Sequence, residues 1–305
     1  MSNIINPYRF AGEGPSPGGD YPDISPDLAT VVTDGDYKYI VFNDHDTFEV
    51  DATGDSGGSD EIEYLVVAGG GPSGPSGYYG TGGGAGGYRA GTETLNSTGT
   101  GTVTVGAGGA GAGAAWPTGP ANNGDDSQLE LPDFTQIDAS GGGGAAQWKV
   151  ISGQGYVENG RDGGSGGGGG IGANASPGAG NVGGYDPVEG YDGASSGASY
   201  YQAGAGGASE EGYLPGYIDG VYMAGNGGDG IENLIATTSN GDNGYYAGGG
   251  AGYGGTGAGS GGAGGGGGGY NNGAANTGGG GGGYSTGAAT NGGSGVVIIR
   301  WKYRN

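Results

Sequence analysis

Residues 62–71 read IEYLVVAGGG, and residues 292–301 read GGSGVVIIRW. Each stretch joins an apolar segment of strand length to a glycine run, the first where the glycine-rich part of the chain begins and the second where it ends. Segments rich in Val, Ile, Leu and Tyr are typical of β-strands. Because the two segments bracket most of the glycines, we expect them to pair and to close the base of a folded glycine-rich domain.

Glycine supplies 90 of the 305 residues, whereas proline supplies 13 and no strict G-X-Y period is present, which excludes collagen. A net charge of -23 with few aliphatic residues would by itself indicate disorder. The apolar residues are nevertheless gathered into strand-length segments, and 22 tyrosines are unusual for a solvated linker. Composition therefore favours a fold held together more by backbone hydrogen bonds than by a large side-chain core.

Long glycine runs suggest how such a fold is built. A run in polyproline II geometry has about three residues per turn and no internal hydrogen bonds. Its amides and carbonyls must find partners if they are buried, and several runs lying side by side can supply them to one another. We therefore predict packed polyglycine-II helices, with the other residues at turns and outward positions, and essentially no α-helix.

The predicted fold class is mostly β and irregular, with a small antiparallel β framework. We divide the chain into four parts. They are an extended, proline-rich attachment arm (1–30), a β-hairpin and entry strand (31–68), the polyglycine-II domain with loop insertions (69–295), and a closing β-strand with a basic tail (296–305). The hairpin is expected to join Tyr37–Phe42 to Thr47–Val50, and a further strand is expected at 101–105.

Composition also argues against several kinds of functional site. The chain has no cysteine and one histidine, His45, so we predict no metal, no cofactor and no enzymatic activity. Eight Lys and Arg against 31 Asp and Glu argue against nucleic-acid binding. No apolar segment approaches the roughly 20 residues of a membrane helix, and no signal-peptide layout is present, so we expect neither membrane insertion nor ordinary secretion.

Paired tyrosines are the best binding candidates. Amphipathic rings can cover a sugar or a protein patch, and nearby carboxylates can accept hydrogen bonds from hydroxyl groups. The predicted binding residues are Tyr200, Tyr201, Tyr245, Tyr246, Asp186, Asp192 and Asp242, and Tyr78, Tyr79, Trp116 and Trp148 are further candidates. The competing interpretation is that these rings are structural and supply bulk that a glycine array otherwise lacks.

Four segments also carry a resemblance to a known family. YLVVAGGG (64–71), GGGAGGYR (82–89), TVTVGAGG (102–109) and GGSGVVIIR (292–300) resemble the glycine-rich domain of tailed-bacteriophage tail-fibre and adhesin proteins. Some members of that family are sandwiches of polyglycine-II helices. The resemblance implies a place on the virion surface and receptor recognition by loops, with a bacterial surface glycan or an outer-membrane protein as the receptor.

The resulting expectation is a non-enzymatic virion protein on the tail or particle surface, extracellular after lysis. The arm would attach it to other virion proteins through Asn6, Pro7, Tyr8, Arg9 and Phe10. Closed symmetry is common among repeated subunits, so a homo-oligomer, such as a trimer, is expected. Two alternatives stay open. One is a capsid or tail decoration protein without receptor binding, and the other is an extracellular or ice-binding glycine-rich protein.

Overall fold

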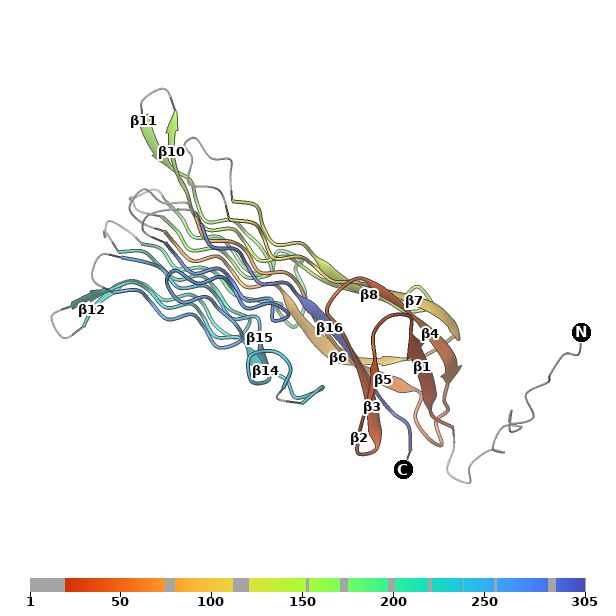
Figure 1. Cartoon of the computed structure of the whole chain (residues 1–305). Coiled ribbons are helices and arrows are strands. Elements are labelled where there is room, and N and C mark those ends of the chain that lie inside the picture. The colour runs from red at the N-terminus through yellow and green to blue at the C-terminus, as the bar shows by residue number, and fades with distance from the viewer. Residues whose placement is uncertain are drawn as a thin grey trace, which may run out of the picture.

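A computed structural model describes residues 20–74, 80–111, 121–151, 154–170, 175–196, 201–218, 221–237, 239–254, 257–284 and 289–304. These residues form β-strands and irregular extended segments without any helix, which confirms the predicted fold class. A two-sheet β-sandwich occupies one end of the molecule, and a bundle of extended runs projects from it (Figure 1). We call the sandwich the base, the runs between residues 69 and 295 the glycine bundle, and the end of the bundle farthest from the base its outer end.

Each sheet of the base has five strands in antiparallel order. The first sheet is β1 (Pro22–Pro26), β4 (Asp46–Thr53), β7 (Gly99–Thr104), β8 (Ser127–Glu130) and β9 (Gln136–Ala139). The second is β2 (Val31–Asp34), β3 (Tyr37–Phe42), β16 (Val296–Lys302), β5 (Glu61–Val67) and β6 (Tyr88–Thr94). Three hairpins complete the strands: β10 (Trp148–Ile151) with β11 (Gln154–Val157), β12 (Gly216–Ile218) with β13 (Val221–Met223), and β14 (Ile231–Glu232) with β15 (Tyr245–Tyr246).

The predicted closure of the domain is confirmed. Strand β16 pairs with β5 from Val296↔Val67 to Trp301↔Ile62. It also pairs with β3 on its other side, so the last strand of the chain lies in the middle of the second sheet. The strand expected at 101–105 is present as β7.

The predicted hairpin between Tyr37–Phe42 and Thr47–Val50 is wrong. Strand β3 pairs with β2 through a turn at Gly35, whose φ is +60°, whereas β4 belongs to the opposite sheet. The reason is that both strands carry a large apolar face: the rings of Phe42 and Phe48 lie 6.3 Å apart across the sandwich, each almost fully buried. The connection therefore crosses between the sheets. The base also begins earlier than residue 31, because β1 pairs with β4.

A side-chain core fills the space between the two sheets. Ile40, Val50, Leu129 and Val297 have no exposed surface, and Trp301 has 1%. Although the chain is poor in aliphatic residues, 17 of its 35 Val, Leu and Ile residues lie in these ten strands. The base is thus a conventional sandwich, in which the inward faces of both sheets interlock.

The glycine bundle is held together by its backbone. In the run 82–87, the amides of residues 83, 84 and 85 donate to carbonyls of three different runs, at Gly281, Gly143 and Gly206. The amides of residues 86 and 87 then return to the first two of these runs, so the direction of donation repeats every three residues. The carbonyls of residues 82–85 accept from four amides, those of Gly168, Gly250, Gly71 and Ser165, so this run is surrounded by bonded neighbours.

Close approach explains why glycine is required here. A β-carbon at Gly84 would lie 2.1 Å from the carbonyl oxygen of Ser165, and one at Gly83 would lie 2.2 Å from that of Gly71. Neither contact is sterically allowed. Ala85 escapes this restriction because its methyl group joins a second apolar cluster, with Leu65, Ile298 and Tyr246, on the outer face of the second sheet.

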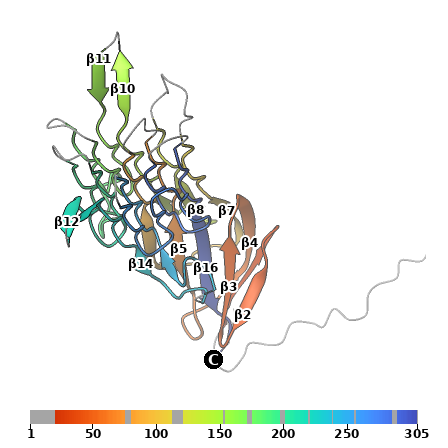
Figure 2. The ribbon, with the colours of Figure 1, turned by 60° about the vertical axis from the view of Figure 1, so that its left-hand side comes forward.

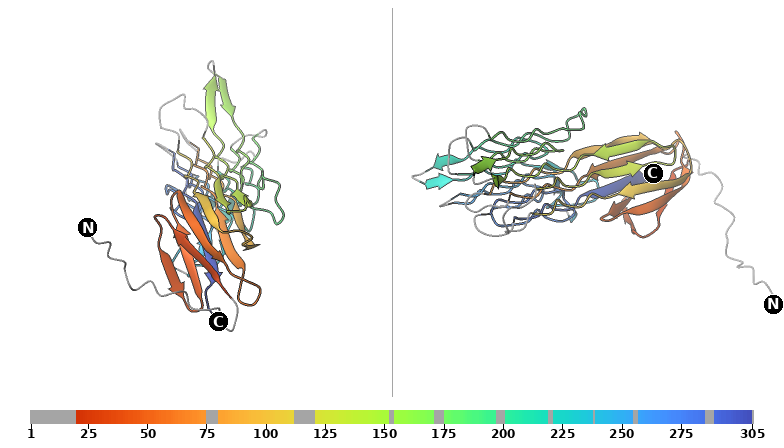
Figure 3. Two further views of the ribbon diagram at one scale, coloured as in Figure 1. Left: turned by 90° about the vertical axis from the view of Figure 1, so that its right-hand side faces the viewer. Right: turned by 90° about the horizontal axis from the view of Figure 1, so that it is seen from above.

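Successive runs alternate in direction, so the turns between them alternate between the base and the outer end. Figure 2 shows β10–β11 and β12–β13 at the outer end, whereas β14–β15 lies beside the second sheet. Seen from above, the runs lie side by side along one direction, and the C-terminal strand lies in the base (Figure 3). Turns at the outer end are therefore positioned by a bundle of hydrogen-bonded runs.

Candidate functional site

Two groups of tyrosine rings lie at the outer end of the glycine bundle. In the first group, the rings of Tyr201 and Tyr222 stack with centroids 4.8 Å apart and planes 9° from parallel. Tyr217 packs against Tyr222 at 4.4 Å with its ring tilted by 56°. Hairpin β12–β13 supplies Tyr217 and Tyr222, which pair directly across its two strands. Their side chains remain 62% and 50% exposed, so the group presents a broad ring surface to solvent.

The second group contains Tyr253, Tyr270 and Tyr284. Tyr270 makes edge-on contacts with both of the others, at centroid distances of 4.7 Å and 4.9 Å, and is itself 46% exposed. Backbone pairing places this group at the outer end: the amide of Tyr253 donates to Gly80, where the run leading back to β6 begins, and that of Tyr270 donates to Gly283.

The two groups adjoin the same part of the bundle. The backbone of Gly254, next to Tyr253, lies against the ring of Tyr201, and Gly257 lies against the sulfur of Met223, next to Tyr222. Glycine at these positions leaves room for the rings. We call Tyr201, Tyr217, Tyr222, Tyr253, Tyr270 and Tyr284 together the tyrosine surface.

The tyrosine surface is aromatic but carries little charge. None of the described residues immediately beside its rings in sequence is charged, although the whole chain has a net charge of -23. Asp219, which follows β12 in the sequence, lies outside the described residues. Offset and edge-on rings with hydroxyl groups combine an apolar body with hydrogen-bonding tips. Such a surface suits the face of an uncharged, hydroxyl-rich ligand better than that of an ionic one.

Among the predicted binding residues that the structure describes, only Tyr201 belongs to this surface. Tyr245, Tyr246 and Asp242 lie at β14–β15, beside the base, where Tyr246 is fully buried. Burial raises the pKa of Tyr246 to about 12. The carboxylate of Asp242 accepts from the amides of Gly264 and Gly265, each at 3.3 Å, so it helps to hold a turn of the bundle.

The remaining predicted residues are not brought together. Asp186 is exposed in a turn near the base, next to a cis bond to Pro187, and Asp192 accepts from the amide of Gly180 at 2.7 Å. His45, the single histidine, accepts from the amide of Val105 through Nδ1 at 3.1 Å. The predicted residues that lie outside the described residues are Asn6, Pro7, Tyr8, Arg9, Phe10, Tyr78, Tyr79, Trp116 and Tyr200.

Sequence reasoning missed five of the six members of the tyrosine surface. It favoured adjacent tyrosine pairs, whereas most of these rings come from single tyrosines next to turns. The useful signal is the alternation of the runs: since each run reverses direction, every second turn reaches the outer end. Counting turns from β5 onward would have placed Tyr253 and Tyr284 there.

Comparison with known protein families gives a match over most of the chain. A model described as "Glycine-rich domain" matches residues 47–302. The chain belongs to this glycine-rich domain family. The match spans the whole glycine bundle and most strands of the base. No curated protein matches the chain. Among the described residues, the structure has no helix of the length and apolarity needed to cross a membrane.

Proposed function

We propose that this glycine-rich domain protein is a non-enzymatic virion surface protein of the tail-fibre or adhesin type. In this proposal the base faces the particle, and the tyrosine surface contacts a receptor on a bacterial cell. The observation that carries it is the gathering of six tyrosines at the end of the molecule farthest from the base. Exposed aromatic surface of this kind marks interaction sites in soluble proteins.

We further propose that the runs of the bundle are polyglycine-II helices. The threefold rotation of amide donors along residues 83–87 supports this, since polyproline II geometry has about three residues per turn. Such a bundle would be a stiff support, because each run is bonded to several neighbours. A stiff support holds the rings in place before binding and so lowers the entropic cost of recognition.

The proposed attachment is through the arm. Asp20, the first described residue, is hydrogen-bonded to Asp55 and Ser59 in a loop at the base. The arm would therefore leave the molecule at the end opposite the tyrosine surface. We propose that it contacts other virion proteins and that the protein works as a homo-oligomer, which would multiply weak contacts at the receptor.

A bacterial surface glycan is the receptor class that this chemistry favours. Sugar rings present C–H faces that pack on aromatic rings, and their hydroxyl groups hydrogen-bond with tyrosine. The scarcity of charge near the rings fits an uncharged saccharide. An outer-membrane protein receptor would be recognised through the same rings, and the experiment below distinguishes the two.

The test measures binding of fluorescently labelled protein to a panel of bacterial strains by flow cytometry. We expect Tyr222→Ala and Tyr270→Ala each to weaken binding by about tenfold, the usual loss when a central aromatic contact is removed. The matched control is Phe134→Ala, which removes an 83%-exposed aromatic ring at the base. Removal of surface polysaccharide from the cells should abolish binding, whereas survival of binding would indicate a protein receptor.

Two results would contradict the proposal. If the tyrosine variants bind like the parent protein while binding itself is strong, the tyrosine surface is not the receptor site. If no strain binds and the protein is found in many copies within a capsid or tail lattice, a decoration role without receptor binding is the better explanation.

A further inference from the structure

One edge of the base differs from the other three. Exposed sheet edges in natural proteins are protected by short strands, charges, prolines or bulges. Strand β1 has Pro22, Pro26 and a register shift at Asp23, and β2 and β9 have four residues each. Strand β6 carries two charged side chains, Arg89 and Glu93, but it has seven residues, no proline and an unbroken register against β5. It is therefore the edge best able to accept another strand.

The hydrogen-bonding groups of β6 support this. The amide of Tyr88 points away from β5 and donates to the carbonyl of Glu189 at 2.9 Å. Since directions alternate along an antiparallel strand, the amides and carbonyls of Ala90 and Thr92 also point away from β5. Both residues are exposed, and no other described residue hydrogen-bonds to these groups. Four main-chain groups are thus available at this edge.

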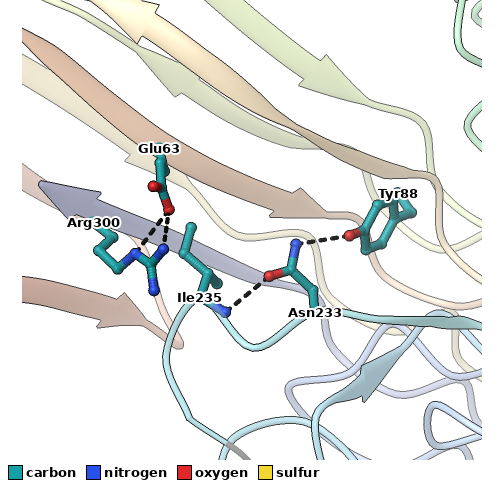
Figure 4. A network of polar contacts seen from close by, with 5 residues as sticks. All are labelled: Glu63, Tyr88, Asn233, Ile235 and Arg300. Carbon is teal, nitrogen blue, oxygen red and sulfur yellow. Dashed lines mark hydrogen bonds and ion pairs between the residues drawn. The ribbon is translucent and has the colours of Figure 1, made fainter. Parts of the chain in front are cut away.

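A groove of about 410 Å³ lies beside this edge, on the outer face of the second sheet. The floor of the groove is formed by residues that lie side by side on three neighbouring strands. Arg300 of β16 lies opposite Glu63 of β5, and Glu63 lies opposite Thr92 of β6. The Arg300 Nε donates to Glu63 Oε2 at 2.7 Å (Figure 4). Leu234, 51% exposed, and Ile235 line its other side. A groove of this kind can receive a side chain from a strand added to β6.

The wall of the groove is held in place. Asn233 Nδ2 donates to the hydroxyl of Tyr88 at 2.8 Å, and its Oδ1 accepts from the amide of Ile235 at 2.9 Å (Figure 4). Asn233 therefore ties the segment 233–235 to β6 itself. Any strand bound along β6 would meet a wall that is already formed.

We propose that β6 and this groove bind an extended peptide segment of a partner protein, which adds a strand to the second sheet and places a lysine or arginine side chain in the groove. Main-chain bonds give affinity in this mode, and a side-chain groove gives selectivity. The aliphatic stem would lie on Leu234, and the cation would share the carboxylate of Glu63 with Arg300. The net charge of -23 favours a basic partner at long range. This site lies at the base and is independent of the proposed receptor binding.

The probe is an acetylated seven-residue peptide of alternating threonine and valine, with lysine at its centre and a fluorescent label at its C-terminus. Its binding to the full chain is measured by fluorescence anisotropy. Thr92→Pro removes an outward amide without removing a bond to β5, and we expect it to weaken binding by about tenfold or more. Thr92→Ala keeps the amide and should bind within about twofold of the parent protein. Circular dichroism confirms that both variants are folded.

A second measurement does not depend on the folding of any variant. The same peptide with alternate amides N-methylated should lose binding to the parent protein, and a peptide with glutamate at its centre should bind more weakly. Glu63→Gln should reduce the preference for lysine over glutamate. Equal binding of the methylated peptide, or no binding of the lysine peptide at millimolar concentration, would overturn the proposal.

Discussion

At the scale of single residues, Tyr246 shows how this chain uses an aromatic ring as core. It is fully buried against Leu65, Ile298 and Ala85, where the glycine bundle meets the second sheet. Its hydroxyl has no hydrogen-bond partner among the described residues. A buried, unpaired hydroxyl costs about 1–3 kcal/mol, so the ring stabilises the fold while its polar atom works against it.

Replacing Tyr246 with Phe tests this. Because burial raises the folded-state pKa to about 12, the ionised form is disfavoured. The stability contributed by neutral Tyr246 is complete below the unfolded pKa of about 10 and is lost as pH rises towards the folded value. In urea unfolding near neutral pH, we expect the free energy of unfolding of Tyr246→Phe to equal that of the parent protein or to exceed it by up to about 1 kcal/mol. It should also lose less stability than the parent between about pH 9 and about pH 11.

The control is Tyr213→Phe, which removes an exposed hydroxyl bonded to Glu210. The bond to Glu210 also raises the pKa of Tyr213, but this hydroxyl lies at the surface, so the change should reduce the alkaline loss of stability less than Tyr246→Phe does. An identical alkaline loss in the parent protein and in Tyr246→Phe would show that Tyr246 is not the buried titrating group.

At the scale of the element, an extended run is stable only if its neighbours approach closely. Gly84 illustrates this, because a β-carbon there would meet the Ser165 carbonyl oxygen at 2.1 Å. We expect Gly84→Ala to lower the free energy of unfolding by about 3 kcal/mol, since two backbones must separate. Thermal unfolding followed by circular dichroism measures the loss.

Gly216→Ala is the matched control for the run. Gly216 lies in β12, and a β-carbon there would have no atom within 4 Å. The change should alter stability by no more than about 0.5 kcal/mol. If both alanine variants were equally stable, close packing of the runs would not be what holds the bundle together.

Sequence patterns predicted some elements better than others. The strands at 62–68 and 296–301 were predictable because each is apolar at nearly every position, as expected for a strand buried on both faces. The strand that pairs with Tyr37–Phe42 could not be predicted, since an apolar segment does not show whether its neighbour belongs to the same sheet or to the facing one. The tyrosine surface was also not predictable as a group, because its members meet only after the runs have folded back and forth.

At the scale of the whole molecule, the chain runs from the base into the glycine bundle and back into the base, which joins the two parts. Strand β16 lies between β3 and β5, so residues at the two ends of the glycine bundle meet in one sheet. Val67 pairs with Val296, and Gly70 donates to the carbonyl of Gly293, which continues the contact into the bundle. Neither part has a separate closure, and we therefore expect them to unfold as one cooperative unit.

Amide exchange of an Ile299→Ala variant tests this cooperativity. Ile299 is fully buried in the base, and truncation of such a residue costs about 2–5 kcal/mol. If unfolding is cooperative, exchange protection should fall by the same factor in β5 and in the run 82–87, although the mutation touches only the base. The control is Val32→Ala, at a 39%-exposed position of edge strand β2, which should leave exchange protection unchanged both in β5 and in the run 82–87. Protection that drops in β5 but persists in 82–87 would instead show that the bundle folds on its own, and the base would then be a separate support.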